Sequence, residues 1–156
     1  MKKILLILPI ILPLVMMAQP MGKMDLINQA KKEVGEMTPK KLKNLLDEAG
    51  DVIVLDVRES EQRSEGSIPS DDMNAEDFFA ITRGNLEWEV EQLIKDKDAV
   101  IVTYCRRGGR GALASKVLRE MGYKNATTLK GGLKGWANAG YPIKTGLGTT
   151  VLKNEK

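Results

Sequence analysis

The chain contains a single cysteine, Cys105, and places it directly before a stretch rich in arginine and glycine. The residues of this stretch are Arg106, Arg107, Gly108, Gly109, Arg110 and Gly111. Successive backbone N–H groups in such a turn converge on a point and can bind an anion. The arginines add formal positive charge, so the Cys105 thiol is expected to ionise readily, and the thiolate is a strong nucleophile. The pattern therefore predicts covalent chemistry on an anionic substrate.

The elements around Cys105 are expected to hold it at a junction between a strand and a helix. The apolar, β-branched residues 100–102 are typical of a buried strand. From Gly111, apolar side chains recur at helical spacing until Gly122 ends the helix. The helix N-terminus adds partial positive charge beside the thiol. An inert buried cysteine is the alternative, but three neighbouring arginines do not suit an apolar pocket.

A second pair of chemically active side chains, Asp56 and Arg58, follows another apolar stretch at 52–55. In an open α/β sheet, ligands gather at the carboxyl ends of the strands. Asp56 and Arg58 are therefore expected at the same edge as Cys105. Two roles are open for them: they support the rim of the site, or Arg58 contacts the anionic substrate directly.

The rest of the chain alternates between helical and strand patterns. Helices are expected at 24–37, 39–49, 76–81, 86–94 and 133–139, a helical turn at 61–65, and a third strand at 126–129. This alternation predicts an α/β fold with a central parallel sheet and helices on both faces. Trp88 is expected to pack against the sheet and Trp136 to lie in the core. After Thr145 the sequence has little pattern, which predicts a flexible tail.

Five short segments follow one another along the chain: residues 55–59 (LDVRE), 65–69 (EGSIP), 104–110 (YCRRGGR), 118–123 (LREMGY) and 129–136 (LKGGLKGW). In this order they resemble the single-domain rhodanese-like sulfurtransferase family. The resemblance covers roughly residues 36–145. It implies a rhodanese fold with a five-stranded sheet and a supporting role for Asp56 and Arg58. The family usually has His at the position of Ser67, whereas this chain contains no histidine.

The residues and the resemblance together predict a sulfurtransferase. Cys105 takes a sulfane sulfur from thiosulfate or a persulfide donor and passes it to a thiol, cyanide or a protein acceptor. A non-catalytic binding or redox-sensing module is the alternative from another class. A phosphatase on the same scaffold is a further alternative, but cysteine phosphatases place arginine six residues after the nucleophile. Here that position is Gly111, and Arg110 comes one residue early.

The first residues have the composition of an export signal. Lys2 and Lys3 precede an apolar run from Ile4 to Ala18, which is shorter than the roughly 20 residues of a spanning helix. Residues 1–18 are therefore expected to be a signal peptide, with an uncleaved anchor or a buried helix as alternatives. The expected location is exported, in the periplasm. The remaining chain divides into an N-terminal helix or linker at 19–35, a rhodanese domain at 36–145 and the tail at 146–156.

The net charge and the counts of cysteine and histidine exclude several other kinds of partner and site. The formal charge of the 156 residues is +3, and it falls to +1 without Lys2 and Lys3, so no nucleic-acid partner is expected. One cysteine and no histidine rule out an internal disulfide and zinc sites built from these residues. No cofactor and no metal are expected. The expected partners are a small anionic sulfur donor and its acceptor, with membrane contact only through an uncleaved N-terminus, and the protein is expected to be a monomer.

Overall fold

The computed structural model describes residues 20–48, 50–69 and 77–152. The expected signal peptide at 1–18 and residues 70–76, which include the first residue of the helix expected at 76–81, lie outside the described residues. Among the described helices, none is long and apolar enough to cross a membrane.

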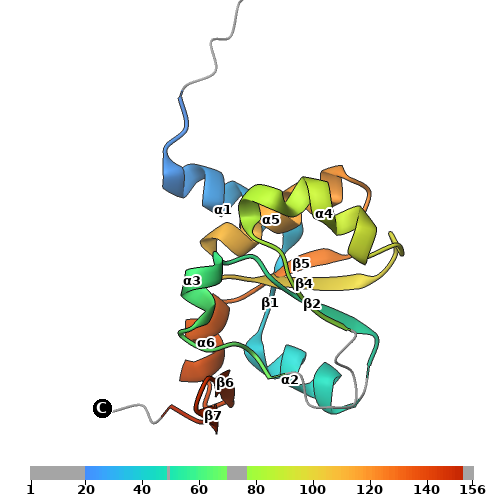
Figure 1. Cartoon of the computed structure of the whole chain (residues 1–156). Coiled ribbons are helices and arrows are strands. Elements are labelled where there is room, and N and C mark those ends of the chain that lie inside the picture. Colours follow the sequence, from blue (N-terminus) through green and yellow to red (C-terminus); the bar gives the residue numbers. More distant parts are fainter. Residues whose placement is uncertain (1–19, 49, 70–76, 153–156) are drawn as a thin grey trace, which may run out of the picture.

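A five-stranded sheet forms the centre of the molecule (Figure 1). Its strands are β1 (Glu36–Met37), β2 (Val52–Asp56), β3 (Phe78–Ala80), β4 (Val100–Tyr104) and β5 (Ala126–Leu129). They run in the order β1-β5-β4-β2-β3, and every neighbouring pair is parallel. β2 and β4 are central and nearly all buried, as their continuous apolar sequences predict. The parallel α/β sheet and the five-stranded order are therefore confirmed.

Helices cover both faces of this sheet (Figure 1). Three lie on one side: α1 (Lys23–Val34), α4 (Leu86–Leu93), which follows the 3₁₀ turn η2 (Arg83–Asn85), and α5 (Gly109–Glu120). On the other side lie α2 (Pro39–Asp47), α6 (Gly132–Asn138) and an antiparallel hairpin of β6 (Ile143–Thr145) and β7 (Gly148–Thr150). The short α3 (Ser60–Arg63) lies near α6 at one end of the sheet.

Each face of the sheet has its own apolar core. Val54, Val102 and Trp136 belong to the core on the α2 and α6 side. Leu55 and Ile101, which alternate with them along the strands, belong to the core on the α4 and α5 side. The prediction of a core position for Trp136 is confirmed, because it is buried.

Two side chains in the second half of α5 bind the C-terminal end of α1. The Arg119 guanidinium donates hydrogen bonds to the carbonyl oxygens of Glu33 (2.8 Å) and Val34 (2.9 Å). Lys116 forms an ion pair with Glu33 at 2.9 Å. A cation at a helix C-terminus satisfies free carbonyls and the helix dipole. These contacts fix α1 across α5.

Four local expectations are wrong. Residues 78–80 form β3 instead of part of a helix, and the helix expected at 24–37 ends at Val34, so Glu36–Met37 forms β1. Residues 148–150 form β7 where no pattern was expected. Trp88 does not pack against the sheet, since it is 79% exposed.

Candidate active site

Cys105 lies directly after β4, at the carboxyl edge of the sheet, where the sequence places it. The residue is only 3% exposed and belongs to the apolar cluster on the α5 side, with Val57 and Ile81. Its thiol therefore lies at the base of the loop at 105–111 and not on the open surface.

The start of α6 fixes the orientation of this loop. The Leu133 N–H donates to the Cys105 carbonyl oxygen at 2.8 Å, and the Lys134 N–H donates to the Arg106 carbonyl oxygen at 3.0 Å. In a trans peptide the N–H points opposite to the preceding carbonyl. The N–H groups of Arg106 and Arg107 are therefore turned away from α6.

The N–H groups of residues 106–111 are free of hydrogen bonds to any residue that the structure describes. The first helical backbone bond after the loop runs from the Ala112 N–H to the Gly108 carbonyl oxygen at 2.9 Å. Gly108 has a φ of +88° and precedes α5, and both Gly108 and Gly111 are buried. Buried N–H groups normally have a partner. Their arrangement at the start of α5 is suited to an anion held in the loop.

The turn after β5 packs directly against the loop on the side of α6. A Cβ atom built on Gly132 would lie 2.2 Å from the Cys105 carbonyl oxygen and 2.7 Å from the Gly108 nitrogen. Gly132 also has a φ of +60°. Both the close approach and the left-handed backbone therefore require glycine. The sequence marks residues 131–132 as part of the family resemblance, but it gives no signal of this contact.

Asp56 and Arg58 form a buried ion pair beside the loop. The Arg58 side chain is fully buried, and its Nη2 lies 2.6 Å from the Asp56 Oδ2. The same guanidinium donates to the carbonyl oxygens of Gln62 (3.0 Å) and Gly66 (2.7 Å). Burial alone would lower the pKa of Arg58, but the hydrogen bonds and charge of Asp56 outweigh it and raise the pKa. This arrangement positions the segment at 59–66 and supports the rim of the site.

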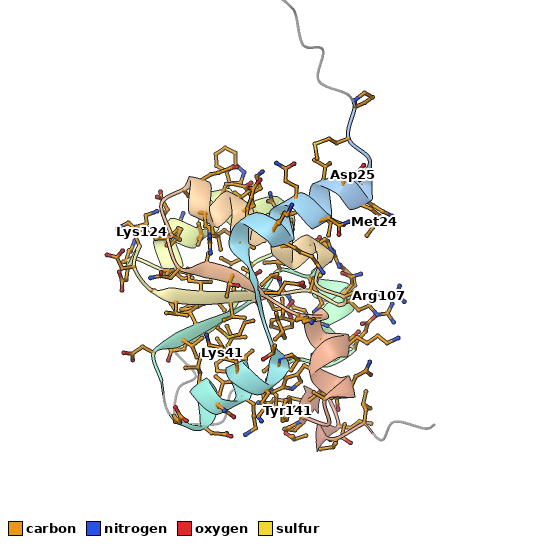
Figure 2. All side chains as sticks on the ribbon, turned by 180° about the vertical axis from the view of Figure 1, so that it is seen from behind. Met24, Asp25, Lys41, Arg107, Lys124 and Tyr141 are labelled. Atoms are coloured by element: carbon orange, nitrogen blue, oxygen red, sulfur yellow. The ribbon has the colours of Figure 1, made fainter. Side chains whose placement is uncertain are left out.

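The three loop arginines differ in their surroundings. Arg106 forms an ion pair with Glu65 (3.1 Å), and Arg110 forms one with Glu59 (3.6 Å). Arg107 is exposed and has no ion-pair partner within the described ranges; Figure 2 shows it pointing outward near the start of α6. The segment around α3 therefore partly neutralises two of the three cations that the sequence places at the site.

Ser67 occupies the position where the resemblance leads us to expect His. Its backbone exchanges two hydrogen bonds with Lys144 of β6, each 2.8 Å long. This bridge connects the segment after α3 with the C-terminal hairpin. The contact uses backbone atoms alone, so it does not depend on the side chain at position 67.

Comparison with known proteins decides the family. Residues 38–139 match the sequence model of the Rhodanese-like domain family. The chain belongs to this family. The matched range includes the whole of the loop at 105–111 together with Asp56 and Arg58, and α1 lies before it.

Relatives of this rhodanese-like domain include proteins described as sulfurtransferases. A sulfurtransferase of Allochromatium vinosum is 31% identical over 110 residues, which are 70% of this chain and 94% of the relative. A polysulfide-sulfur transferase homodimer of Wolinella succinogenes has a TM-score of 0.63 and 30% identity, over 75% of this chain and 82% of that chain. A Rhodopseudomonas palustris protein of unknown function, described as a possible tyrosine phosphatase, has a TM-score of 0.69 and 29% identity, over 81% of this chain and 98% of that chain. The family and its sulfurtransferase members support sulfur transfer as the general activity of this rhodanese-like domain.

Proposed function

We propose that this domain moves a sulfane sulfur from thiosulfate or a persulfide to a thiophilic acceptor, through a persulfide on Cys105. One observation carries the proposal. The Cys105 thiol lies at the base of a loop whose N–H groups at 106–111 have no hydrogen-bond acceptor among the described residues. A persulfide ends in an anionic sulfur atom, and preorganised N–H donors are suited to stabilising it.

In the first step the Cys105 thiolate attacks the outer sulfur of thiosulfate. A new S–S bond forms to Cys105, the sulfur–sulfur bond of the donor breaks, and its electron pair leaves with sulfite. The enzyme is left with an anionic persulfide. The step starts from the thiolate, so it includes no proton transfer to a general base.

In the second step a nucleophilic acceptor attacks the outer sulfur of the persulfide. With cyanide as acceptor, a carbon–sulfur bond forms, the Cys105 persulfide bond breaks, and thiocyanate leaves as the Cys105 thiolate returns. A thiol or a protein acceptor follows the same course and becomes a persulfide. This two-step covalent exchange uses the same N–H groups in both steps.

Phosphatase activity is the second candidate, because the Rhodopseudomonas palustris structure is described as a possible tyrosine phosphatase. The loop of this chain argues against it. The Arg110 guanidinium is held by an ion pair with Glu59 and by a hydrogen bond that it donates to Gln62 Oε1. The next position, where a cysteine phosphatase has its arginine, is Gly111. A Cβ atom at Gly111 would lie 2.6 Å from the Thr128 Oγ1, so no larger side chain fits there.

The two activities are separated by one comparison. The purified protein is expected to turn over thiosulfate and cyanide and to leave an aryl phosphate intact under the same conditions. The Cys105→Ser variant is the control, and it is expected to lose the thiosulfate reaction. Equal turnover by the wild type and Cys105→Ser would instead support a non-catalytic binding or redox-sensing module.

We also propose that the protein is exported to the periplasm after cleavage of residues 1–18. The proposal rests on the charge of Lys2 and Lys3 and on the apolar run from Ile4 to Ala18. The intact mass of the protein recovered from a periplasmic extract is expected to lack these residues. A full-length mass in the membrane fraction would support the uncleaved anchor.

A further inference from the structure

We propose that Ile27 of α1 is a positioning residue for sulfur transfer, because its side chain holds the first turn of α5 beside Cys105. This inference rests on the proposed function and adds a residue from outside the matched family range of 38–139. A Cβ atom built on Gly109 would lie 3.1 Å from the Ile27 Cδ1 and 3.7 Å from both its Cγ1 and its Cγ2. Outside α5, these three carbons are the nearest atoms in the part of the chain that the structure describes.

Three glycines of the active-site loop are each packed by a different element. A Cβ at Gly108 would lie 3.4 Å from the Gly131 nitrogen, in the turn after β5. A Cβ at Gly111 would lie 2.6 Å from the Thr128 Oγ1, on β5 itself. Gly109 meets α1 instead. The first two contacts come from residues within the matched family range, whereas the third depends on a helix that precedes it.

Ile27 lies beside the first turn of α5 and not in front of it. The free N–H groups at a helix N-terminus point along the helix axis, whereas side chains project from the side of the helix. The Ile27 side chain occupies the Cβ side of Gly109, so it leaves the path of an anion to the N–H groups open. Its effect on the reaction therefore passes through the position of the loop and not through contact with the substrate.

The position of α1 is fixed by its contacts with α5. Two side chains of α5 bind the C-terminal end of α1, as described above. Ala30 and Val34, which follow Ile27 by three and seven positions, are buried. Residues at this spacing share one face of a helix, and α1 lies along α5 (Figure 1). A helix held in this way presents Ile27 to Gly109 as a fixed surface.

A displaced first turn would slow the transfer of sulfur. In the proposed step the Cys105 thiolate attacks the outer sulfur of thiosulfate, the S–S bond of the donor breaks, and its electron pair leaves with sulfite. The Cys105 persulfide then carries a negative charge. Preorganised N–H donors stabilise this charge only where they are aimed at it, and a displacement of about 1 Å can slow a reaction by about 100-fold. Removal of the Ile27 carbons would leave space into which the turn can move.

The test compares Ile27→Ala with Leu26→Ala by the rate at which thiosulfate loads Cys105. Leu26 is the matched control, because it is also a large apolar residue of α1 but lines a surface groove with Leu113 and Val117 of α5. The saturating loading rate is expected to fall about fivefold or more in Ile27→Ala and less than about twofold in Leu26→Ala. The thiosulfate concentration that gives half of this rate is expected to change less than about twofold, since neither replacement removes a positive charge.

A double-mutant cycle tests the contact itself. Gly109→Ala adds a methyl group that meets Ile27 in the wild type but fills the vacated space in Ile27→Ala. Gly109→Ala alone is therefore expected to slow loading, and in the Ile27→Ala chain it is expected to restore part of the lost rate. The two effects are expected to depart from additivity by about threefold or more. Additive effects, or equal losses in Ile27→Ala and Leu26→Ala, would overturn the proposal.

The amide signals of the loop give a readout that does not depend on turnover. In NMR spectra, Ile27→Ala is expected to shift the signals of Gly108, Gly109 and Gly111 more than Leu26→Ala does. Ile27→Val, which removes the Cδ1 atom alone, is expected to give smaller shifts of the same signals. Equal shifts in the Ile27 and Leu26 variants would overturn the proposal. If thiosulfate does not load Cys105 in the wild type, the proposed function fails, and these signals still decide whether Ile27 positions the loop.

Discussion

Replacement of Gly132 by alanine tests whether the turn after β5 holds the active-site loop in place. The new Cβ would lie 2.2 Å from the Cys105 carbonyl oxygen and 2.7 Å from the Gly108 nitrogen. The φ of +60° at this position adds strain of about 1–2 kcal/mol for an L-residue. Displacement of two backbone segments adds roughly 1–3 kcal/mol, as for other overpacking substitutions. Gly132→Ala is therefore expected to lower the free energy of unfolding by about 2–5 kcal/mol.

Gly140→Ala is the matched control for this variant. Gly140 has a similar φ of +82°, but a Cβ there would meet nothing within 4 Å. It carries the backbone strain without the clash, so a loss of about 1–2 kcal/mol is expected. Urea denaturation gives both values, and the rate of Cys105 loading by thiosulfate is expected to fall at least about tenfold in Gly132→Ala alone, because misplaced groups react slowly. Similar stability and loading in the two variants would refute the idea that this turn positions the loop.

Two further predictions concern the buried groups beside the loop. Asp56→Ala leaves the Arg58 guanidinium buried without its carboxylate, so urea denaturation is expected to show that the free energy of unfolding falls by about 3–5 kcal/mol. Asp98, which forms an exposed ion pair with Lys124, is the control. Asp98→Ala is expected to lower the free energy of unfolding by less than about 1 kcal/mol. Burial and the neighbouring Asp56 carboxylate raise the pKa of Tyr104 above its usual value of 10.0. Above pH 10 the unfolded state therefore loses the Tyr104 proton while the folded state keeps it. The free energy of unfolding of the wild type is expected to fall as the pH rises through this range. Tyr104→Phe removes this contribution, and an unchanged alkaline slope in that variant would contradict the assignment.

The centre of the fold and the position of the nucleophile could be predicted because short-range patterns determine them. Residues 52–55 of β2 and 100–102 of β4 are apolar and mostly β-branched, which favours strands. Gly108 and Gly109 permit a sharp turn, and Gly108 has a φ of +88° directly before α5. Local sequence therefore contains enough information to place Cys105 between a strand and a helix.

The short strands could not be predicted in this way. β1 has two residues and β3 and β7 have three, which is too few for a period to appear. Each is a strand because a longer or neighbouring partner pairs with it: β5 for β1, β2 for β3 and β6 for β7. Their backbone conformation depends on tertiary pairing and not on local preference.

The wrong prediction for Trp88 has a geometric reason. Leu86 and Val90 are the buried residues of α4 and lie four positions apart, on one face of the helix. Trp88 lies two positions from each of them, and with 3.6 residues per turn this is the opposite face. Large aromatic residues are usually buried, but here the helical spacing outweighs that tendency.

The charges around the loop also required the structure. The sequence gives three arginines after Cys105, but it cannot show that α3 brings Glu59 and Glu65 to Arg110 and Arg106. These pairs join residues that are far apart in the chain. The positive charge available to a substrate is therefore smaller and more localised than the composition of the loop predicts.

The most direct measurement of the central claim is the intact mass of the protein after treatment with thiosulfate. The account predicts a gain equal to one sulfur atom, located on the peptide that contains Cys105 and lost again on addition of cyanide. The Cys105→Ser variant is expected to show no gain. A wild-type protein whose mass stays unchanged, or a gain that persists in Cys105→Ser, would contradict the claim that Cys105 carries the transferred sulfur.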